Sequence, residues 1–251
     1  MILDMDGVLW RADQPIGDLP HLFSEISKRG YRIVLATNNA TLTIEQFLDK
    51  LQGFGVELAS WQVVNSSQTA AHYLSQRYPR GGPVFIIGEE GLCQELSKCG
   101  YYQADKDVLA VVVGMDHHLT YEKLKVAALL IQTGAPFIGT NPDRTYPTPY
   151  GLVPGSGAIL AALETATSVQ PTIMGKPSPE LYLLALERLR ASPSETLVVG
   201  DRLETDIAGA QAIGCRTALV LSGVSSEEEA RHYAPSPDFI APDLTSLLEI
   251  L

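Results

Sequence analysis

The sequence contains few cysteines, no long apolar run and no cluster of basic residues. Its 251 residues include three cysteines, Cys93, Cys99 and Cys215. An odd number of thiols without a Cys-x-x-Cys pair argues against a disulfide framework and against a zinc knuckle. No apolar run approaches the ~18 residues that a membrane span requires, and no basic segment precedes the first apolar residues. We therefore expect no membrane association and a cytoplasmic protein.

Positive charge is also scarce. Lys and Arg number 18 against 29 Asp and Glu, which gives a formal net charge of −11. Binding to a nucleic-acid backbone requires clustered Lys and Arg, so we expect no nucleic-acid partner. The composition is 45% hydrophobic and 19% charged, as in an ordinary globular protein. A chain of this length can form one large domain or two smaller ones.

Short apolar runs alternate with longer amphipathic stretches. The runs lie at residues 33–35, 84–87, 109–113, 196–199 and 217–221. Continuous apolar strands that alternate with helices predict an α/β fold with a Rossmann-like parallel sheet covered on both faces. Asp18 is placed to cap a helix that runs to Arg29, with Gly30 after its end.

Two breaks in composition predict that one domain is inserted into another. The first is the turn-rich segment 79–83, Pro-Arg-Gly-Gly-Pro, and the second is Val-Gln-Pro at 169–171. About ninety residues with their own strands and helices lie between them, enough for a small α/β domain. We therefore predict a core domain of residues 1–79 and 172–251, and an inserted smaller domain of residues 80–171.

Two carboxylates follow the first predicted strand. Asp4 and Asp6 lie two residues apart in Asp-Met-Asp-Gly, and strand alternation would direct both side chains the same way. Like charges this close require either a hard cation such as Mg²⁺ or a raised pKa on one carboxyl group. Taken alone, the pair also fits an exposed, solvated turn, because Asp and Gly are common turn residues.

Polar residues also follow the second apolar run. Thr37, Asn38 and Asn39 come directly after residues 33–36. They offer a hydroxyl, side-chain amides and backbone N–H groups, which suit the oxygens of a phosphate group. An ordinary turn is the alternative interpretation of these three residues.

Further charged residues occur near the ends of two later apolar segments. Lys176 lies between Gly175 and Pro177, where the alternative is a solvated surface charge. Asp201 and Asp206 are five residues apart across a predicted strand-to-helix turn, a spacing that suits metal ligation.

Taken together in chain order, these four groups of residues resemble the motifs of the haloacid dehalogenase superfamily of phosphohydrolases. The four motifs are Asp4-Met5-Asp6-Gly7, Thr37, Lys176, and Gly200-Asp201 with Asp206. The first gap is 37 − 6 = 31 residues and the second is 176 − 37 = 139, so an accessory cap fits only in the second gap. That position is similar to the superfamily's second type of cap. Within it, segments 111–116, 139–143 and 154–158 resemble the NagD-like branch, which includes p-nitrophenyl-phosphate and pyridoxal-phosphate phosphatases.

The resemblance implies a role for each core residue. Asp4 would attack phosphorus and form an aspartyl-phosphate, while Asp6 would protonate the leaving oxygen and later activate water. Thr37 and Lys176 would stabilise the negative charge on the phosphate oxygens.

By the same resemblance, Mg²⁺ would be held by Asp4, Asp201 and the backbone carbonyl of Asp6. Asp206 would either bind the ion through a water molecule or orient Lys176, and the sequence leaves both open.

The resemblance also suggests that three residues of the cap face the substrate, namely Asn141, Asp143 and Arg144. For Arg144, the polarity of a surface loop is the alternative. Related phosphatases with this cap often dimerise through it, which leaves a homodimer open.

We therefore expect a Mg²⁺-dependent phosphatase of small phosphorylated metabolites, such as sugar, nucleotide, glycerol or pyridoxal phosphates. Two alternatives remain, a catalytically silent module that binds such metabolites and a phosphotransferase. The intact carboxylates favour an enzyme, because clustered like charges are costly without a functional reason.

Overall fold

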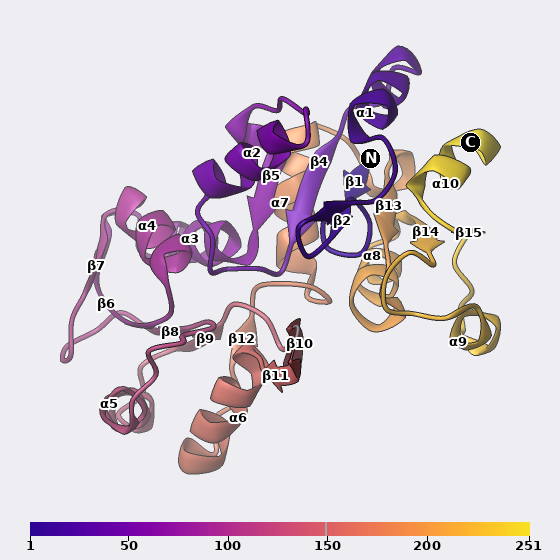
Figure 1. Cartoon of the computed structure of the whole chain (residues 1–251). Helices are drawn as coiled ribbons and strands as arrows, with labels where there is room; N and C mark the ends of the chain where they lie inside the picture. The colour runs from indigo at the N-terminus through magenta and orange to yellow at the C-terminus, as the bar shows by residue number, and fades with distance from the viewer. Residues whose placement is uncertain (149) are drawn as a thin grey trace. The chain divides into compact units, whose positions relative to one another are not determined.

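The apolar runs of the sequence form strands, which are organised into two main sheets in two units of the chain (Figure 1). The computed structural model describes residues 1–148 and 150–251. Unit 1 comprises Met1–Thr37, Ile44–Val64 and Lys176–Leu251. Unit 2 comprises Asn38–Thr43 and Asn65–Gly175. The predicted α/β class is confirmed.

Unit 1 is built around a six-stranded sheet in the order β15-β14-β13-β1-β4-β5. Its strands are β1 (Ile2–Leu3), β4 (Val34–Thr37), β5 (Val63–Asn65), β13 (Leu197–Gly200), β14 (Arg216–Val220) and β15 (Phe239–Ala241), and a small hairpin adds β2 (Trp10–Arg11) and β3 (Gln14–Pro15). The helices are α1 (Leu19–Lys28), α2 (Ile44–Gly53), α7 (Pro179–Leu189), α8 (Ala208–Ala212), α9 (Glu227–His232) and α10 (Leu244–Ile250), with short helical turns η1 (Ser60–Gln62), η2 (Pro193–Glu195) and η3 (Leu203–Ile207).

The central strands of unit 1 run parallel. Strand β1 pairs in parallel with β13 and with β4, and Ile2 is in register with both Val198 and Val34. Helix α7 packs on this sheet, because Leu181 and Leu189 lie in one buried cluster with those three residues. Burying one such aliphatic side chain stabilises the fold by about 1.5–3 kcal/mol. The carboxyl ends of the parallel strands therefore meet at one well-anchored edge.

Helix α1 begins where the sequence predicts. The side chain of Asp18 accepts a hydrogen bond from the backbone N–H of His21 at 3.1 Å and so caps the helix. Gly30 follows the last turn with a φ of +77°, the left-handed conformation that glycine adopts without strain. One buried side of the helix carries Leu22 and Ile26.

Unit 2 contains a five-stranded sheet in the order β12-β9-β8-β6-β7. Its strands are β6 (Gly82–Ile87), β7 (Tyr101–Gln103), β8 (Val111–Val113), β9 (Phe137–Gly139) and β12 (Thr172–Ile173), and β10 (Thr145–Thr148) and β11 (Gly151–Pro154) form an antiparallel hairpin. Its helices are α3 (Ser66–Arg77), α4 (Glu90–Lys98), α5 (Tyr121–Gln132) and α6 (Ser156–Thr167).

Helices pack on both faces of the sheet in unit 2. Val84 belongs to a buried cluster with residues of α3 and α4, including Leu74 and Leu92. The next residue, Phe85, belongs to a different cluster with residues of α5 and α6, such as Ile131. Adjacent residues of a strand point to opposite faces, so β6 contributes to two hydrophobic layers.

The boundaries of the units differ from the predicted ones at 79/80 and 171/172. Helix α3 belongs to unit 2, because its apolar side chains pack against β6 and α4. The segment 79–83 is thus largely the turn between α3 and β6. At the other end, Thr172 and Ile173 pair with Ile138 and Gly139 of β9, so unit 2 extends to Gly175.

Residues 38–43 also group with unit 2. Ser66 donates a side-chain hydrogen bond to the carbonyl of Asn38 at 2.7 Å, and Ser67 donates to the carbonyl of Ala40 at 3.1 Å. The carbonyl of Thr41 accepts from the backbone N–H of Gly91 at 3.0 Å. The short segment is therefore bound to α3 and α4 by hydrogen bonds.

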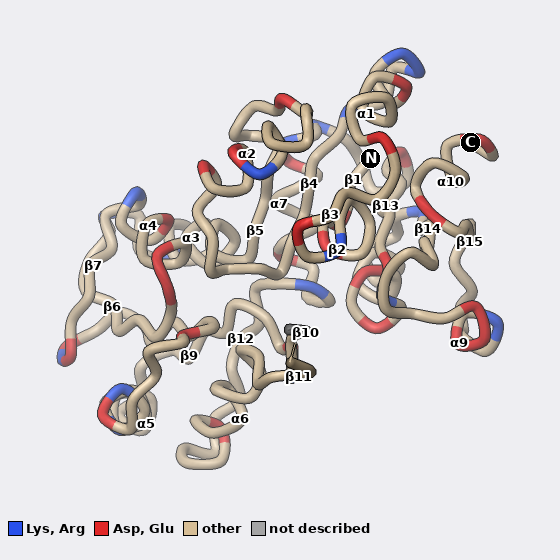
Figure 2. Tube along the Cα trace, in the orientation of Figure 1, with Lys and Arg blue, Asp and Glu red and all other residues tan. Residues whose placement is uncertain are grey.

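Charged residues are dispersed along the described chain. Figure 2 shows Lys and Arg scattered singly or in small groups among the Asp and Glu positions of both units. Among the described residues, no helix has the length and apolar character needed to cross a membrane.

Candidate active site

The predicted core residues gather at strand ends of unit 1. Asp4 follows β1, Thr37 ends β4 and Asp201 follows β13. Because these strands are parallel neighbours, their carboxyl ends lie at the same edge of the sheet, where open α/β sheets bind their ligands. Strand β1 ends at Leu3, so Asp4 and Asp6 both belong to the following turn, and the predicted strand alternation does not apply to them.

Lys176 links two of the carboxylates. Its Nζ lies 2.8 Å from Asp4 Oδ1 and 2.6 Å from Asp206 Oδ1. It also donates a hydrogen bond to the carbonyl oxygen of Ala36 at 3.1 Å, in the strand that ends at Thr37. The lysine is only 3% exposed, which rules out the alternative of a solvated surface charge.

Burial and mutual charge shift the pKa values of this group. Burial raises the pKa of Asp4 well above its usual range, although the neighbouring ammonium of Lys176 opposes the shift. Burial acts to lower the pKa of Lys176, but Asp206 and Asp4 outweigh it and the net shift is upward. Burial and then the charge of Asp206 raise the pKa of Asp201 to about 6. The positive charge of Lys176 thus compensates only part of the negative charge of the three carboxylates.

Three carboxylates form a cluster of candidate metal ligands. Asp4, Asp201 and Asp206 each offer an oxygen, and these atoms lie within 4.8 Å of one another. Asp201 Oδ1 is buried without a hydrogen-bond partner among the described residues. A buried, unpaired carboxylate oxygen is costly unless it meets a cation, and all-oxygen donor sets are those that Mg²⁺ and Ca²⁺ prefer. The residues present therefore fit a hard divalent cation.

Two glycines and a backbone amide position Asp201. Its Oδ2 accepts a hydrogen bond from the N–H of Val224 at 2.8 Å, and its carbonyl accepts from Ser225 at 3.0 Å. A Cβ atom at Gly7 or at Gly223 would overlap the Asp201 carboxylate. Gly7 also has a φ of +82°, so the turn favours glycine there for a second reason. Oδ1 is therefore the Asp201 oxygen that has no hydrogen bond among the described residues.

Asp206 is held by its own turn. Its Oδ2 accepts from the backbone N–H of Arg202, the residue before η3, at 3.0 Å, and its Oδ1 lies near Lys176 Nζ. The hydroxyl of Tyr182 lies 3.1 Å from the carbonyl of Asp206 and 3.0 Å from that of Thr205, and donates to this pair. Burial raises the pKa of Tyr182 well above its usual range, so the phenol stays protonated as a donor.

Asp6 differs from the other core carboxylates because it is exposed. Its Oδ1 accepts a hydrogen bond from Trp10 Nε1 at 2.8 Å. Its side chain is not part of the three-carboxylate cluster found among the described residues. The prediction that Asp6 binds a metal rests on its backbone carbonyl and stays a prediction.

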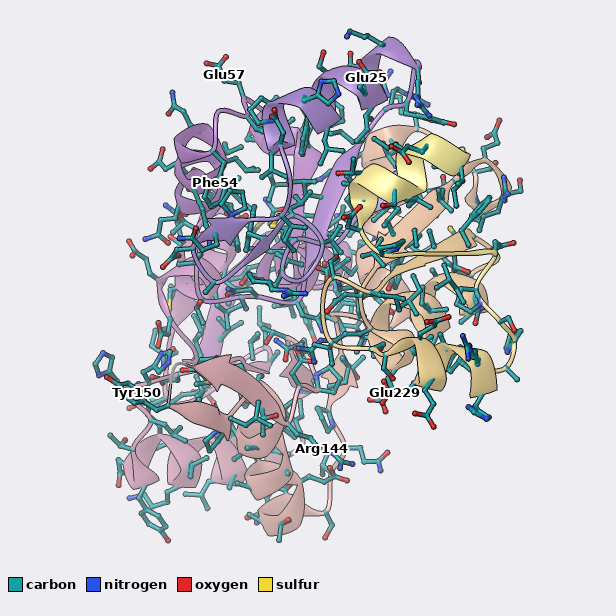
Figure 3. All side chains as sticks on the ribbon, turned by 45° about the vertical axis from the view of Figure 1, so that its right-hand side comes forward. Glu25, Phe54, Glu57, Arg144, Tyr150 and Glu229 are labelled. Carbon is teal, nitrogen blue, oxygen red and sulfur yellow. The ribbon has the colours of Figure 1, made fainter. Side chains whose placement is uncertain are left out.

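The other predicted binding residues lie in unit 2. The carbonyl of Asn38 accepts from Asn141 Nδ2 at 2.8 Å, and Asn38 Nδ2 lies 3.4 Å from Asp143 Oδ2. Asn39 Oδ1 accepts from the N–H of Thr41 at 2.9 Å. Arg144 is exposed (Figure 3). The structure thus brings Asn38, Asn141 and Asp143 together in one hydrogen-bonded group.

Some residues of the site were not identified from the sequence. Trp10, Tyr182, Gly223 and Val224 contact the predicted carboxylates or their backbone, but none belongs to a short motif that marks chemistry. For Trp10, the sequence carries one signal. It lies four residues after Asp6, a spacing that a tight turn can bring together.

Comparisons with known proteins show which family the sequence matches. A family model described as haloacid dehalogenase-like hydrolase matches residues 1–102, and a second, described as HAD-hydrolase-like, matches residues 173–247. An acid sugar phosphatase of Staphylococcus aureus is 35% identical over 248 residues, which cover 98% of this chain and 95% of that protein.

Solved structures are similar over nearly the whole chain. NagD from Escherichia coli K-12 has a TM-score of 0.90 and 32% identity, covering 97% of this chain and 95% of that one. A glycerol phosphate phosphatase, Rv1692 from Mycobacterium tuberculosis, was solved in complex with magnesium. It has a TM-score of 0.90 and 36% identity, covering 98% of this chain and 75% of that one.

Proposed function

Because the chain belongs to the haloacid dehalogenase-like hydrolases and is a NagD-like phosphatase, we propose that it hydrolyses small sugar- or glycerol-phosphate monoesters with Mg²⁺, through an aspartyl-phosphate on Asp4. The observation that carries the proposal is the buried group in which Lys176 contacts Asp4 and Asp206 while one oxygen of Asp201 stays unpaired. The glycerol phosphate phosphatase Rv1692 was solved with magnesium and with calcium, and Mg²⁺ is our assignment for this chain.

In the first step, an Asp4 carboxylate oxygen attacks phosphorus, and the bond between phosphorus and the ester oxygen breaks. Asp6 gives its proton to the leaving oxygen, so the alcohol departs neutral. In the second step Asp6 takes a proton from water, which attacks phosphorus and breaks the bond to Asp4. Inorganic phosphate leaves, and both carboxyl groups return to their starting state.

The remaining residues stabilise charge. Lys176 places an ammonium beside Asp4, where negative charge spreads over the phosphate oxygens during transfer. The buried Thr37 offers a hydroxyl and a backbone N–H at the end of β4 for the same oxygens. When bound by Asp4 and Asp201, Mg²⁺ supplies positive charge that offsets the carboxylates and the phosphate. We assign Asp206 to the positioning of Lys176, because its two oxygens already contact Lys176 and Arg202.

Removal of the metal tests the proposal directly. Treatment with a chelator should abolish release of inorganic phosphate from p-nitrophenyl phosphate and glycerol phosphate, and added Mg²⁺ should restore it, because the carboxylates then repel the substrate. Phosphate release is measured with and without an alcohol acceptor. Full activity in the chelator would contradict the metal assignment, and transfer of phosphate to the acceptor in preference to water would favour a phosphotransferase.

Replacement of the acid tests the role of Asp6. Asp6→Asn should lower kcat/KM for glycerol phosphate by about 10²-fold or more, and much less for p-nitrophenyl phosphate, because nitrophenolate leaves without a proton. A series of aryl and alkyl phosphates gives the dependence on the leaving group. Equal losses of kcat/KM across the series would show that Asp6 is not the general acid.

Asp143 tests whether unit 2 selects the substrate. We propose that Asn141, Asp143 and Arg144 contact the non-phosphate part of the ester, and that Asn38 and Asn39 bind phosphate oxygens. Asp143→Ala should change KM and the ranking of metabolite esters while p-nitrophenyl phosphate turnover stays within about tenfold. The exposed Asp105→Ala is the matched control. A uniform loss on all esters would place Asp143 in the catalytic machinery instead.

A further inference from the structure

A tight turn brings Asp6 and Trp10 together. The carbonyl of Met5 accepts from the backbone N–H of Leu9 at 2.8 Å, and the N–H of Gly7 donates to the carbonyl of Trp10 at 2.8 Å. Asp6 and Trp10 also form a β-bridge. The backbone therefore fixes the distance between the two side chains before their own contact is considered.

The side chains meet through one hydrogen bond of fixed direction. Trp10 Nε1 donates to Asp6 Oδ1 at 2.8 Å. An indole N–H can only donate, so Oδ1 remains an acceptor whether or not the carboxyl group is protonated. Because a carbonyl oxygen accepts better than a hydroxyl oxygen, this hydrogen bond favours the protonated form of Asp6 that carries its proton on Oδ2.

Two contacts hold the indole ring in place. Trp10 is 1% exposed, and the ring of Phe54 (labelled in Figure 3) lies 5.9 Å away at an interplanar angle of 42°. The Nζ of Lys50 lies 4.7 Å from the centre of the indole ring, close enough for a cation–π interaction. That ammonium is itself anchored, because it donates to the carbonyl of Ala12 at 2.7 Å. An immobile donor thus faces an exposed acid.

We propose that Trp10 is a positioning residue for proton transfer by Asp6, holding the carboxyl group by Oδ1 so that Oδ2 presents the proton to the leaving oxygen. This inference rests on the proposed acid–base role of Asp6. A general acid accelerates a reaction only when it lies within hydrogen-bond reach of the group that it protonates. Loss of the indole N–H should therefore affect the chemical step and leave substrate binding unchanged.

The test compares leaving groups in two variants that lack the N–H. Trp10→Phe removes the donor but also some volume. Replacement of Trp10 by β-(3-benzothienyl)alanine, in a Trp61→Phe background, keeps the bicyclic shape and replaces N–H by sulfur. In both, kcat/KM for glycerol phosphate, which reports the first transfer step and not the later attack of water, should fall about tenfold, while kcat/KM for p-nitrophenyl phosphate should fall less than about threefold. Trp61→Phe alone is the matched control, because Trp61 is 47% exposed and lies in η1.

Other results would overturn the inference. An equal loss of kcat/KM on both esters in the benzothienyl variant would show a structural role, and no loss of kcat/KM on glycerol phosphate would show that the N–H is dispensable. Asp6→Asn, measured in parallel, separates this failure from that of the proposed function. If the loss of activity in Asp6→Asn depends on the leaving group and the loss in the Trp10 variants does not, only the inference fails. If Asp6→Asn shows no such dependence, the acid–base role fails and the inference with it.

Discussion

Asp4→Asn is expected to reduce phosphate release by at least about 10³-fold on every ester, including p-nitrophenyl phosphate. An amide has the shape of the carboxylate but cannot attack phosphorus, so no leaving group rescues the variant. Single-turnover incubation with a ³²P-labelled ester should label the wild-type chain transiently at Asp4 and leave the variant unlabelled. Retention of more than a few per cent of activity would exclude Asp4 as the nucleophile.

The same variant should fold at least as well as the wild type. Burial raises the pKa of Asp4, so its ionised form opposes folding at neutral pH in the absence of metal. The neutral amide removes that cost, and the unfolding midpoint in chelator should not decrease. The matched control is Glu57→Gln, the same chemical change at an exposed carboxylate, which should leave both activity and stability unchanged (Figure 3).

Lys176→Met is expected to lower both activity and stability. Methionine fills a similar volume but leaves Asp4 and Asp206 without the ammonium that lies 2.8 and 2.6 Å from them. Loss of one partner from a buried ion pair costs about 3–5 kcal/mol, much more than loss of a surface pair. Urea unfolding followed by circular dichroism measures the first effect, and phosphate release from p-nitrophenyl phosphate measures the second.

The control for this variant is Lys125→Met. Lys125 pairs with Glu122 one helical turn away, and both side chains are largely exposed. Its replacement should change the unfolding free energy by less than about 1 kcal/mol. If Lys176→Met were as stable as Lys125→Met and retained full activity, the buried ion pairs would have no part in folding or in catalysis.

The sequence was most informative where chemistry follows an apolar strand. Thr37 and Asp201 could be proposed because each ends or directly follows an apolar strand, and parallel strands of one sheet bring such ends to one edge. Lys176 follows β12, a strand of the other sheet, so its ion pairs with Asp4 and Asp206 do not follow from that rule. Burial was the property that the motifs alone could not provide, since a lysine between glycine and proline is equally typical of a surface loop.

Contacts between distant segments were not predictable from these patterns. Tyr182 lies on α7 and reaches the turn of Asp206, and Gly223 packs against Asp201 from the loop after β14. Neither residue type at those positions signals a site, because the contact depends on how α7 and β14 pack against β13. Trp10 is similar, since a buried tryptophan usually serves the core alone.

The unit boundary shows a different limit. Proline and glycine mark a change of direction, and segment 79–83 has them for the turn between α3 and β6. The same residues are typical of linkers between domains, so composition does not distinguish the two cases. The unit to which α3 belongs depends on the residues against which its apolar side chains pack. They pack against β6 and α4, which follow the turn.

The membership of α3 in unit 2 constrains any exchange of caps between related phosphatases. A chimaera with junctions at 79/80 and 171/172 would inherit α3 from one parent and its buried partners Val84 and Leu92 from the other. Mismatched volumes at such a junction create voids or overlaps, each of which costs about 1–3 kcal/mol or more. Junctions at 64/65 and 175/176 would keep the buried cluster of α3, α4 and β6 within one parent. Residues 38–43 should then come from the same parent as α3 and α4.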